Sequence, residues 1–210
     1  YEHPQEKLSH YSKKTVDIEY KFPFGWGELA GIANRTDFDL KQHSEHSRYD
    51  LKYRDDTTGE TYTPYVVEPA MGVDRLLLAL FFEAYEEVEG ARTETTEATK
   101  EKEIVLRLDS QVAPVQVAIL PLLKNKPELV AKAHEVHDML KSSFKTQYDE
   151  AGSIGRRYRR QDEIGTPLAV TIDFDTVEKD EVTIRDRDTM KQDKVPVAKV
   201  VEEIMSRLNA

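Results

Sequence analysis

The sequence predicts an α/β chain, α+β overall, with antiparallel strands in its first part and a mixed sheet flanked by helices in its second. Three observations lead to this prediction. Residues 14–22 alternate apolar and polar side chains, as a half-buried strand does. A strongly apolar helix pattern follows the β-branched run that ends at Glu68. After the polar stretch at 89–103, strand and helix patterns alternate, which is typical of an α/β domain.

The first half contains three expected strands and one helix. The strands are residues 14–22, 27–35 and 61–69, and the polar stretch 37–61 between the last two has few apolar residues. The apolar residues of the helix recur at helical spacing, which predicts a broad buried face. These are Val73, Leu76, Leu77, Leu80, Phe81, Ala84 and Val88. We expect antiparallel strands capped by one buried helix.

The second half reads as a separate domain. Expected strands lie at 115–123, 146–151, 167–174 and 181–188, and expected helices at about 127–144, 154–163 and 197–208. The segment 89–103 has almost nothing to bury and is the best boundary in the chain. The sequence therefore predicts a first domain at 1–90, a linker at 91–112 and a second domain at 113–210.

Composition is that of a soluble globular protein. Of the 210 residues, 39% are apolar and 33% charged, and the net charge of −10 argues against general nucleic-acid binding. There is no cysteine, so disulfides and thiolate metal sites are excluded. No apolar stretch approaches the ~20 residues that span a bilayer. The N-terminus lacks a signal-peptide pattern, and a cytoplasmic protein without a membrane partner is the expectation.

Arg75 stands in the first turn of the apolar helix, where a cation is mildly unfavourable because unpaired N–H groups already carry positive charge. A salt bridge, a solvated position, or an anion held by both the helix end and Arg75 would each account for it. Glu68 ends the preceding strand and suits either a bound ammonium group or an ion pair with a neighbouring strand. Gly72 either lets a ligand such as a base or a phosphate approach the backbone closely at the turn, or is an ordinary turn residue.

Two further segments carry unusual charges. Glu28 and Arg35 lie seven residues apart in a strand, so we expect them on opposite faces, either in a cleft or at the surface. The run RRYRR at 156–160 lies in a helix pattern. It forms either a solvated face paired with Asp162 and Glu163 or a phosphate-contacting patch in which Tyr158 stacks on a base.

The usual metal and nucleotide signatures are missing. His43, Glu45 and His46 resemble part of a metal cluster, but no convincing third ligand accompanies the two histidines, so we predict no metal site. There is no GxxxxGK[ST] loop, no GxGxxG after a strand and no GxSxG elbow. The common nucleotide-binding loops and the hydrolase nucleophile motif are therefore absent.

Several long motifs, in order, resemble one family. FPFGWGELAGIANRTDFDLKQHSEHS at 22–47, YVVEPAMGVDR at 65–75 and IGRRYRRQDEIGTPLAVTIDF at 154–174 with VTIRDRDTMKQ at 182–192 are similar to the C-terminal part of dimeric-type glycyl-tRNA synthetases. The resemblance covers nearly all of the chain from Asp17 onward. It implies a partial antiparallel class II synthetase catalytic sheet, followed by an α/β anticodon-binding domain.

The resemblance also implies roles for individual residues. Arg75 matches the arginine of the third class II signature, which contacts ATP phosphate, and Glu68 matches the carboxylate that holds the glycine ammonium group. The ATP-binding set is Glu28, Leu29, Gly72, Val73, Asp74 and Arg75, and the glycine-binding set is Glu68, Pro69, Ala70, Met71 and Gly72. The resemblance supplies the anticodon function of the second domain, and we take the arginines of the RRYRR run and of the last expected strand as its candidate contacts: Arg156, Arg157, Arg159, Arg160, Arg185 and Arg187.

The implied activity is ATP-dependent, Mg2+-assisted activation of glycine to glycyl-adenylate and its transfer to tRNA(Gly), by a homodimer in the cytoplasm. Many members carry serine where this chain has Ala70, so a hydrogen bond near the substrate is lost. The first two class II signatures would precede Tyr1, so the 210 residues are expected to be inactive alone. The alternatives are a non-catalytic nucleic-acid-binding or polymerase-accessory relative, and a prolyl, threonyl or histidyl synthetase.

Overall fold

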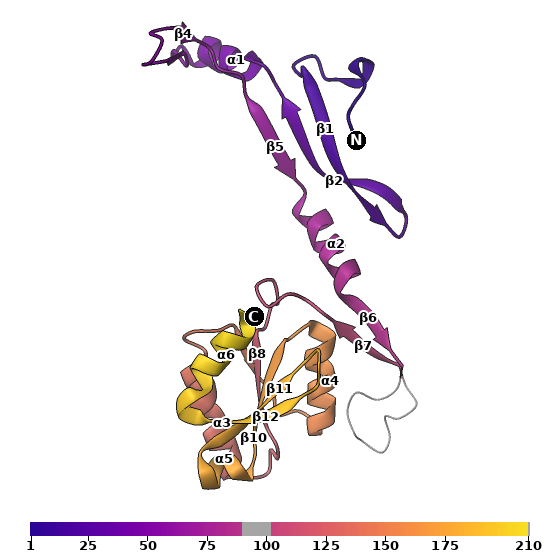
Figure 1. Cartoon of the computed structure of the whole chain (residues 1–210), viewed down its shortest axis with the longest axis vertical. Helices are drawn as coiled ribbons and strands as arrows, with labels where there is room; N and C mark the ends of the chain where they lie inside the picture. The colour runs from indigo at the N-terminus through magenta and orange to yellow at the C-terminus, as the bar shows by residue number, and fades with distance from the viewer. Residues whose placement is uncertain (90–101, 210) are drawn as a thin grey trace. The chain divides into compact units, whose positions relative to one another are not determined.

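The computed structural model of the chain describes residues 1–89 and 102–209 and divides into two compact units, Tyr1–Leu80 and Phe81–Ala210 (Figure 1). Of the predicted linker at 91–112, residues 91–101 lie outside the described residues. Within its remainder, Glu103–Leu106 form strand β7, which pairs antiparallel with β6, Tyr85–Val88.

The first unit is built on a three-stranded antiparallel sheet in the order β1-β2-β5. Its strands are β1, Lys14–Phe22, β2, Gly25–Asn34, and β5, Val67–Met71. The pairing of β1 with β2 shifts between Ile18, which faces Ala30, and Glu19, which faces Glu28. Leu29 is thus an extra residue, a β-bulge, and a bulge changes which side chains share a face.

The polar stretch 37–61 folds into a helix and a hairpin that the sequence pattern did not predict. Helix α1 is Phe38–Ser47, and β3, Tyr53–Arg54, pairs antiparallel with β4, Thr61–Tyr62. Helix α1 buries no residue, which is why it carries no apolar periodicity for a pattern to detect. A short 3-10 turn, η1, spans Gln5–Lys7.

The apolar helix forms where expected, as α2, Val73–Ala84, but the predicted broad buried face is wrong for the described chain. Val73 is 76% exposed, Leu77 47% and Phe81 41%, and the helix buries only Ala79 and Ala84. The described residues leave most of this apolar face uncovered. The chain leaves the helix at Tyr85, because residues 85–88 pair as strand β6.

The second unit contains the predicted mixed sheet, in the order β12-β11-β10-β8-β9. Strand β8, Val117–Pro121, runs parallel to β10, Leu168–Ile172, and to β9, Thr146–Tyr148. Strands β11, Glu181–Asp186, and β12, Gln192–Pro196, complete it in antiparallel pairing. The prediction of an α/β domain is confirmed.

Helices cover both faces of this sheet (Figure 1). The helices are α3, Pro127–Leu140, α4, Ile154–Ile164, α5, Phe174–Lys179, η2, Val197–Lys199, and α6, Val200–Leu208. Val117 and Ile119 belong to the larger core with α3 and α6, whereas Ala118 and Leu120 pack with Tyr158 of α4. Because side chains alternate along a strand, β8 is buried on both faces and reads as a continuous apolar run.

No described helix is long and apolar enough to cross a membrane.

Candidate functional site

A pocket of about 250 Å³ lies on one face of the three-stranded sheet. The strand register explains which residues form its walls. One row across β1, β2 and β5 is Asp17, Gly31 and Ala70. The other row is Thr15, Ala33 and Glu68. Cross-strand partners share a face, so these rows lie side by side. The lining residues are His3, Thr15, Asp17, Glu28, Gly31, Ile32, Ala33, Glu68 and Ala70. Gly31 and Ala33 of the central strand β2 have little or no side chain, which leaves room for a small ligand.

Glu28 joins this face because of the bulge at Leu29. A Cβ added at Gly31 would meet Glu28 Oε1 at 3.3 Å and Asp17 Oδ1 at 3.4 Å, so both carboxylates border the same spot. The expectation that Glu28 and Arg35 point to opposite faces is therefore wrong, since it assumed unbroken alternation. Arg35 reaches the pocket's edge through Glu68.

Glu68 is both an ion-pair partner and a pocket residue. Its Oε2 lies 2.7 Å from Arg35 Nη1, and its side chain remains 46% exposed. Arg35 also donates from Nε and Nη2 to the two oxygens of Asp39, at 2.6 and 2.9 Å. These hydrogen bonds raise the pKa of Arg35 above its usual value and lower that of Asp39. Of the two alternatives from the sequence, the structure contains the ion pair, and the half-exposed carboxylate keeps room for a bound ammonium group.

Sequence reasoning missed the other side of the pocket. His3 Nε2 lies 2.7 Å from Asp17 Oδ2, and both residues line the pocket together with Glu28 and Glu68. An aspartate in an alternating strand looks like an ordinary solvent-facing residue, and His3 precedes the first pattern in the chain. No local signal in the sequence could have joined them.

The start of α2 adjoins the pocket without lining it. Arg75 donates from Nη1 to the backbone carbonyl of Glu28, the residue whose carboxylate borders the pocket. A Cβ at Gly72 would meet only Arg75 Cβ, at 4.0 Å, so no contact in the described chain requires glycine there. The other candidates outside the pocket lining are Leu29, Pro69, Met71, Val73 and Asp74.

Three of the candidate anticodon arginines are buried, and the structure removes them from any contact surface. Arg185 and Asp162 form a two-pronged pair at 2.8 and 2.9 Å, and both side chains are only 3% exposed. Arg157, 1% exposed, donates to the carbonyls of Pro121 and Gly152, and its burial lowers its pKa. Arg187 donates to the carbonyls of Leu108 and Gly165. These guanidinium groups hold loops and strand ends together inside the unit.

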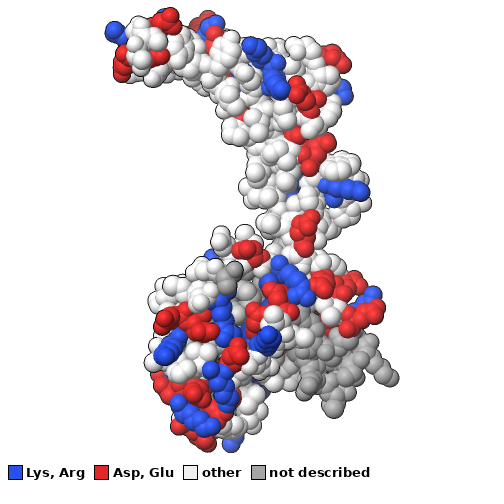
Figure 2. Space-filling view, viewed as in Figure 1, with Lys and Arg blue, Asp and Glu red and all other residues white. Residues whose placement is uncertain are grey.

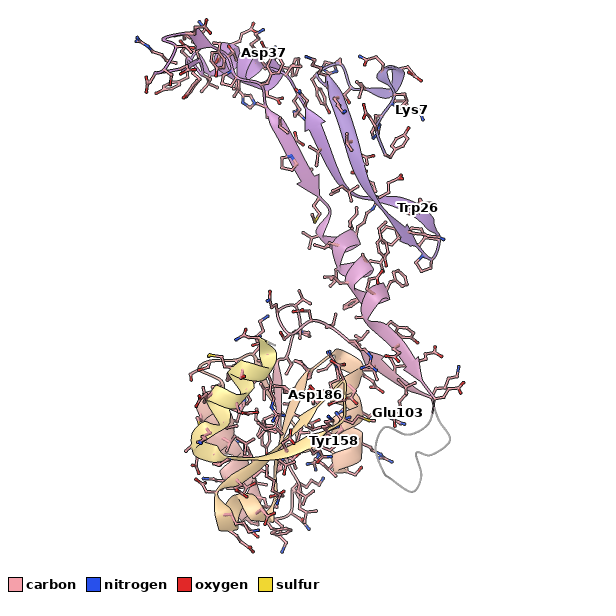
Figure 3. The ribbon with its side chains drawn as sticks, in the orientation of Figure 1. Lys7, Trp26, Asp37, Glu103, Tyr158 and Asp186 are labelled. Atoms are coloured by element: carbon pink, nitrogen blue, oxygen red, sulfur yellow. The ribbon has the colours of Figure 1, made fainter. Side chains whose placement is uncertain are left out.

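The other three arginines remain at the surface of α4. Arg156 is exposed, and Arg159 and Arg160 are partly exposed. Arg159 lies 3.1 Å from buried Glu103, and Arg160 lies 2.6 Å from Asp149. Tyr158, by contrast, is buried and hydrogen-bonded to Thr171 at 2.5 Å, so it is not available for base stacking (Figure 3). The RRYRR run is therefore split between a buried and a surface side.

Charge over the visible face of the second unit is mixed. Figure 2 shows Lys and Arg interspersed with Asp and Glu rather than gathered by sign. Among residues 1–89 and 102–209, no three His, Cys, Asp or Glu side chains lie together as metal ligands would.

Comparisons with known proteins extend over both units. Residues 116–207 match the anticodon binding domain family. Curated proteins named glycine–tRNA ligase from Bifidobacterium longum, Streptomyces coelicolor and Caldanaerobacter subterraneus are 55%, 53% and 54% identical, each over 99% of the chain. The chain spans 42%, 45% and 42% of these relatives and corresponds to their C-terminal part.

Proposed function

We propose that this chain, which is homologous over nearly its whole length to the C-terminal part of glycine–tRNA ligases, serves the same reaction within a longer protein. In that reaction the glycine carboxylate attacks the α-phosphorus of ATP, which gives glycyl-adenylate and releases pyrophosphate. The terminal hydroxyl of tRNA(Gly) then attacks the adenylate carbonyl and releases AMP. The observation that carries the proposal is the identity over both units, together with a small pocket bordered by Glu28 and Glu68.

Glycine would bind in the pocket on the sheet. Glu68 offers a carboxylate to the ammonium group, and the segment Glu68–Gly72 would frame the substrate. Gly31, Ala33 and Ala70 present little or no side chain there, so a larger amino acid would clash with the sheet rather than merely lose contacts. Ala70 has no hydroxyl, so recognition would rest on charge and shape.

ATP would bind beside the pocket, along Glu28–Leu29 and Gly72–Arg75. Arg75 has donors to spare, because one of its five N–H groups is used by the Glu28 carbonyl. The helix N-terminus and the guanidinium would attract the same phosphate, which rationalises a cation in the first turn of α2. Catalysis would rest on in-line positioning and charge stabilisation, without a protein nucleophile.

Mg2+ would arrive with ATP. This ion commonly binds through phosphate oxygens and water with one or two carboxylates, so a dedicated protein cage is not required. Glu28 and Asp74 are the two carboxylates in the proposed ATP-binding set, and either could contact such an ion. When bound, the ion would supply charge neutralisation at the phosphates.

The second unit would bind the anticodon, with the surface narrowed to Arg156, Arg159 and Arg160 on α4. We keep the domain division at 1–90, 91–112 and 113–210 as part of this proposal, along with a cytoplasmic homodimer for the longer protein. Sedimentation of that protein would test the dimer. The accessory-module alternative is not favoured, because the curated relatives are named for ligase activity.

The test uses a full-length protein that contains this chain. Glycine-dependent exchange of pyrophosphate into ATP measures the first step, and charging of tRNA(Gly) measures the second. We expect Arg75→Ala and Glu68→Gln to lower exchange strongly, because each removes a charge-assisted contact. No exchange by the unaltered protein would refute the proposal. Residues 1–210 alone are expected to show none.

A further inference from the structure

The segment from Asn34 to Asp39 leads from the sheet to α1, and none of its residues has a role in the proposed function. Yet Arg35 within it is held on three sides. Its fork meets both oxygens of Asp39, its Nη1 meets Glu68, and its guanidinium carbon lies 4.2 Å from the centre of the Tyr11 ring. The Arg35 and Asp39 side chains are 21% and 19% exposed, so this is a half-buried arrangement beside the pocket.

The backbone around Arg35 is fixed as well. Its N–H donates to the Val66 carbonyl at 2.9 Å, and the Val66 N–H donates to the Thr36 carbonyl at 2.8 Å. Thr36 adopts a positive φ of 57°, and the Asn34 side chain accepts from its N–H at 3.1 Å. This sharp exit from β2 places Asp39, in the first turn of α1, where it meets the Arg35 fork.

We propose that Arg35 is a positioning residue that orients the Glu68 carboxylate for the ammonium group of the bound amino acid. The proposal rests on the proposed function. Nη1 of Arg35 lies 2.7 Å from Oε2 of Glu68, and the Glu68 side chain stays 46% exposed in the pocket lining, so its carboxylate remains open to a substrate. Asp39 takes the Nε donor and one Nη2 donor of Arg35, and Nη1 is the group that meets Glu68.

Charge counting supports this assignment. Arg35 carries one positive charge, and Asp39 and Glu68 carry one negative charge each, so the trio has a net charge of −1. One ammonium group neutralises it. An arginine paired with Glu68 alone would cancel the charge of Glu68, and Glu68 without Arg35 would lose its fixed orientation. Asp39 therefore matters for substrate binding although it does not line the pocket.

The experiment measures steady-state pyrophosphate exchange in the full-length protein for three single variants. Arg35→Lys keeps the charge but cannot hold Asp39 by two prongs and reach Glu68 together. Asp39→Asn leaves the trio neutral. We expect each to raise KM for glycine about tenfold or more, with KM for ATP changed less than about twofold. Lys41→Gln, which breaks the exposed pair with Asp37 on the same helix, is the matched control and should leave both KM values unchanged.

A double-mutant cycle separates positioning from general stability. If Arg35 acts through Glu68, then Arg35→Lys in a Glu68→Gln background should change KM for glycine less than about threefold. Equal effects in both backgrounds, or equal rises in KM for glycine and ATP, would overturn the proposal. Should Arg35→Lys fail to fold, as thermal unfolding would show, Asp39→Asn decides in the same way.

The outcome for the unaltered protein keeps the two proposals apart. Glycine-dependent exchange by that protein, with unchanged glycine KM in both variants, would overturn the role of Arg35 alone. Absence of exchange from the unaltered protein would overturn the ligase function and, with it, the role of Arg35.

Discussion

The two units use the same group of side chains for different ends. In each, an arginine fork grips an aspartate and lies over a tyrosine ring: Arg185 with Asp162 and Tyr158 in the second unit, and Arg35 with Asp39 and Tyr11 in the first. The group in the second unit is closed, because the Arg185 and Asp162 side chains are both 3% exposed and their charges cancel. The group in the first unit is open, because Glu68 adds a third charge that is half-exposed at the pocket.

The difference shows that residue types alone do not separate a structural ion pair from a binding group. Burial and charge balance distinguish the two kinds of group. A buried pair with matched charges is costly to break but has nothing left to offer a ligand. A half-exposed group with one surplus charge contributes less to folding and keeps an electrostatic preference for a ligand of opposite sign.

The largest effect that we predict tests the closed group. Asp162→Ala should destabilise the second unit by about 3–5 kcal/mol, because it leaves the Arg185 charge buried without its partner. Chemical denaturation of the chain, followed by a probe in the second unit, would measure the loss. The matched change in the open group, Asp39→Ala, should leave the midpoint of unfolding close to the unaltered value. Comparable losses in the two variants would mean that the groups do not differ as described.

A second contrast uses glycine. Gly165 ends α4 with φ of +85°, and a Cβ there would lie 2.7 Å from Leu108 Cδ1 and 3.2 Å from the Leu106 carbonyl. Gly165→Ala should therefore cost about 2–4 kcal/mol, from left-handed strain and overpacking together. Thermal unfolding would measure it.

Gly31→Ala is the counterpart in the first unit. The added Cβ would meet only carboxylate oxygens of Glu28 and Asp17, at 3.3 and 3.4 Å, and both side chains can move. We expect a smaller loss of stability than for Gly165→Ala, but a clear rise in KM for glycine in the full-length protein. A stability loss as large as that of Gly165→Ala would contradict the picture of an open pocket wall.

The sequence predicted most of the second unit, because its strands and helices bury regular apolar faces. Val117 to Leu120 form a buried apolar run, and α3 buries residues at helical spacing, so periodicity alone places them. The same method failed for α1, which buries nothing, and for the bulge at Leu29, where small residues carry no alternation. It predicted that the α2 helix exists but not its exposure.

The site was predictable as residue types and not as geometry. Glu68 and Arg75 stand out in one local motif, whereas His3, Asp17 and Arg35 join the pocket region only through strand pairing between distant segments. For the arginines, the prediction failed in the opposite direction, because residues that were expected at a binding surface are buried. Arg157 and Arg185 look like surface cations in the sequence, yet inside the fold Arg157 donates to two backbone carbonyls and Arg185 donates to Asp162. Charge in a sequence does not reveal burial when the partners are distant.

The smallest effect that we predict concerns the open charges of the second unit. Arg156 is the most exposed of the RRYRR arginines, whereas Arg159 and Arg160 already contact Glu103 and Asp149. If α4 faces the anticodon stem, Arg156→Gln should weaken binding of tRNA(Gly) by the full-length protein severalfold. It should also reduce the slope of log affinity against log salt by about 0.7–0.9, because one phosphate contact is lost.

Two comparisons make this last prediction decisive. Lys141→Gln, on the exposed end of α3 and paired with Asp138, is the matched surface control and should leave both affinity and salt slope unchanged. A tRNA with a substituted anticodon should bind more weakly than tRNA(Gly) but show the same relative loss with Arg156→Gln, because a phosphate contact fixes position and carries no sequence information. If Arg156→Gln instead removed only the preference between the two tRNAs, the arginine would be reading a base. If neither affinity nor slope changed, the contact surface would lie on another face of the unit.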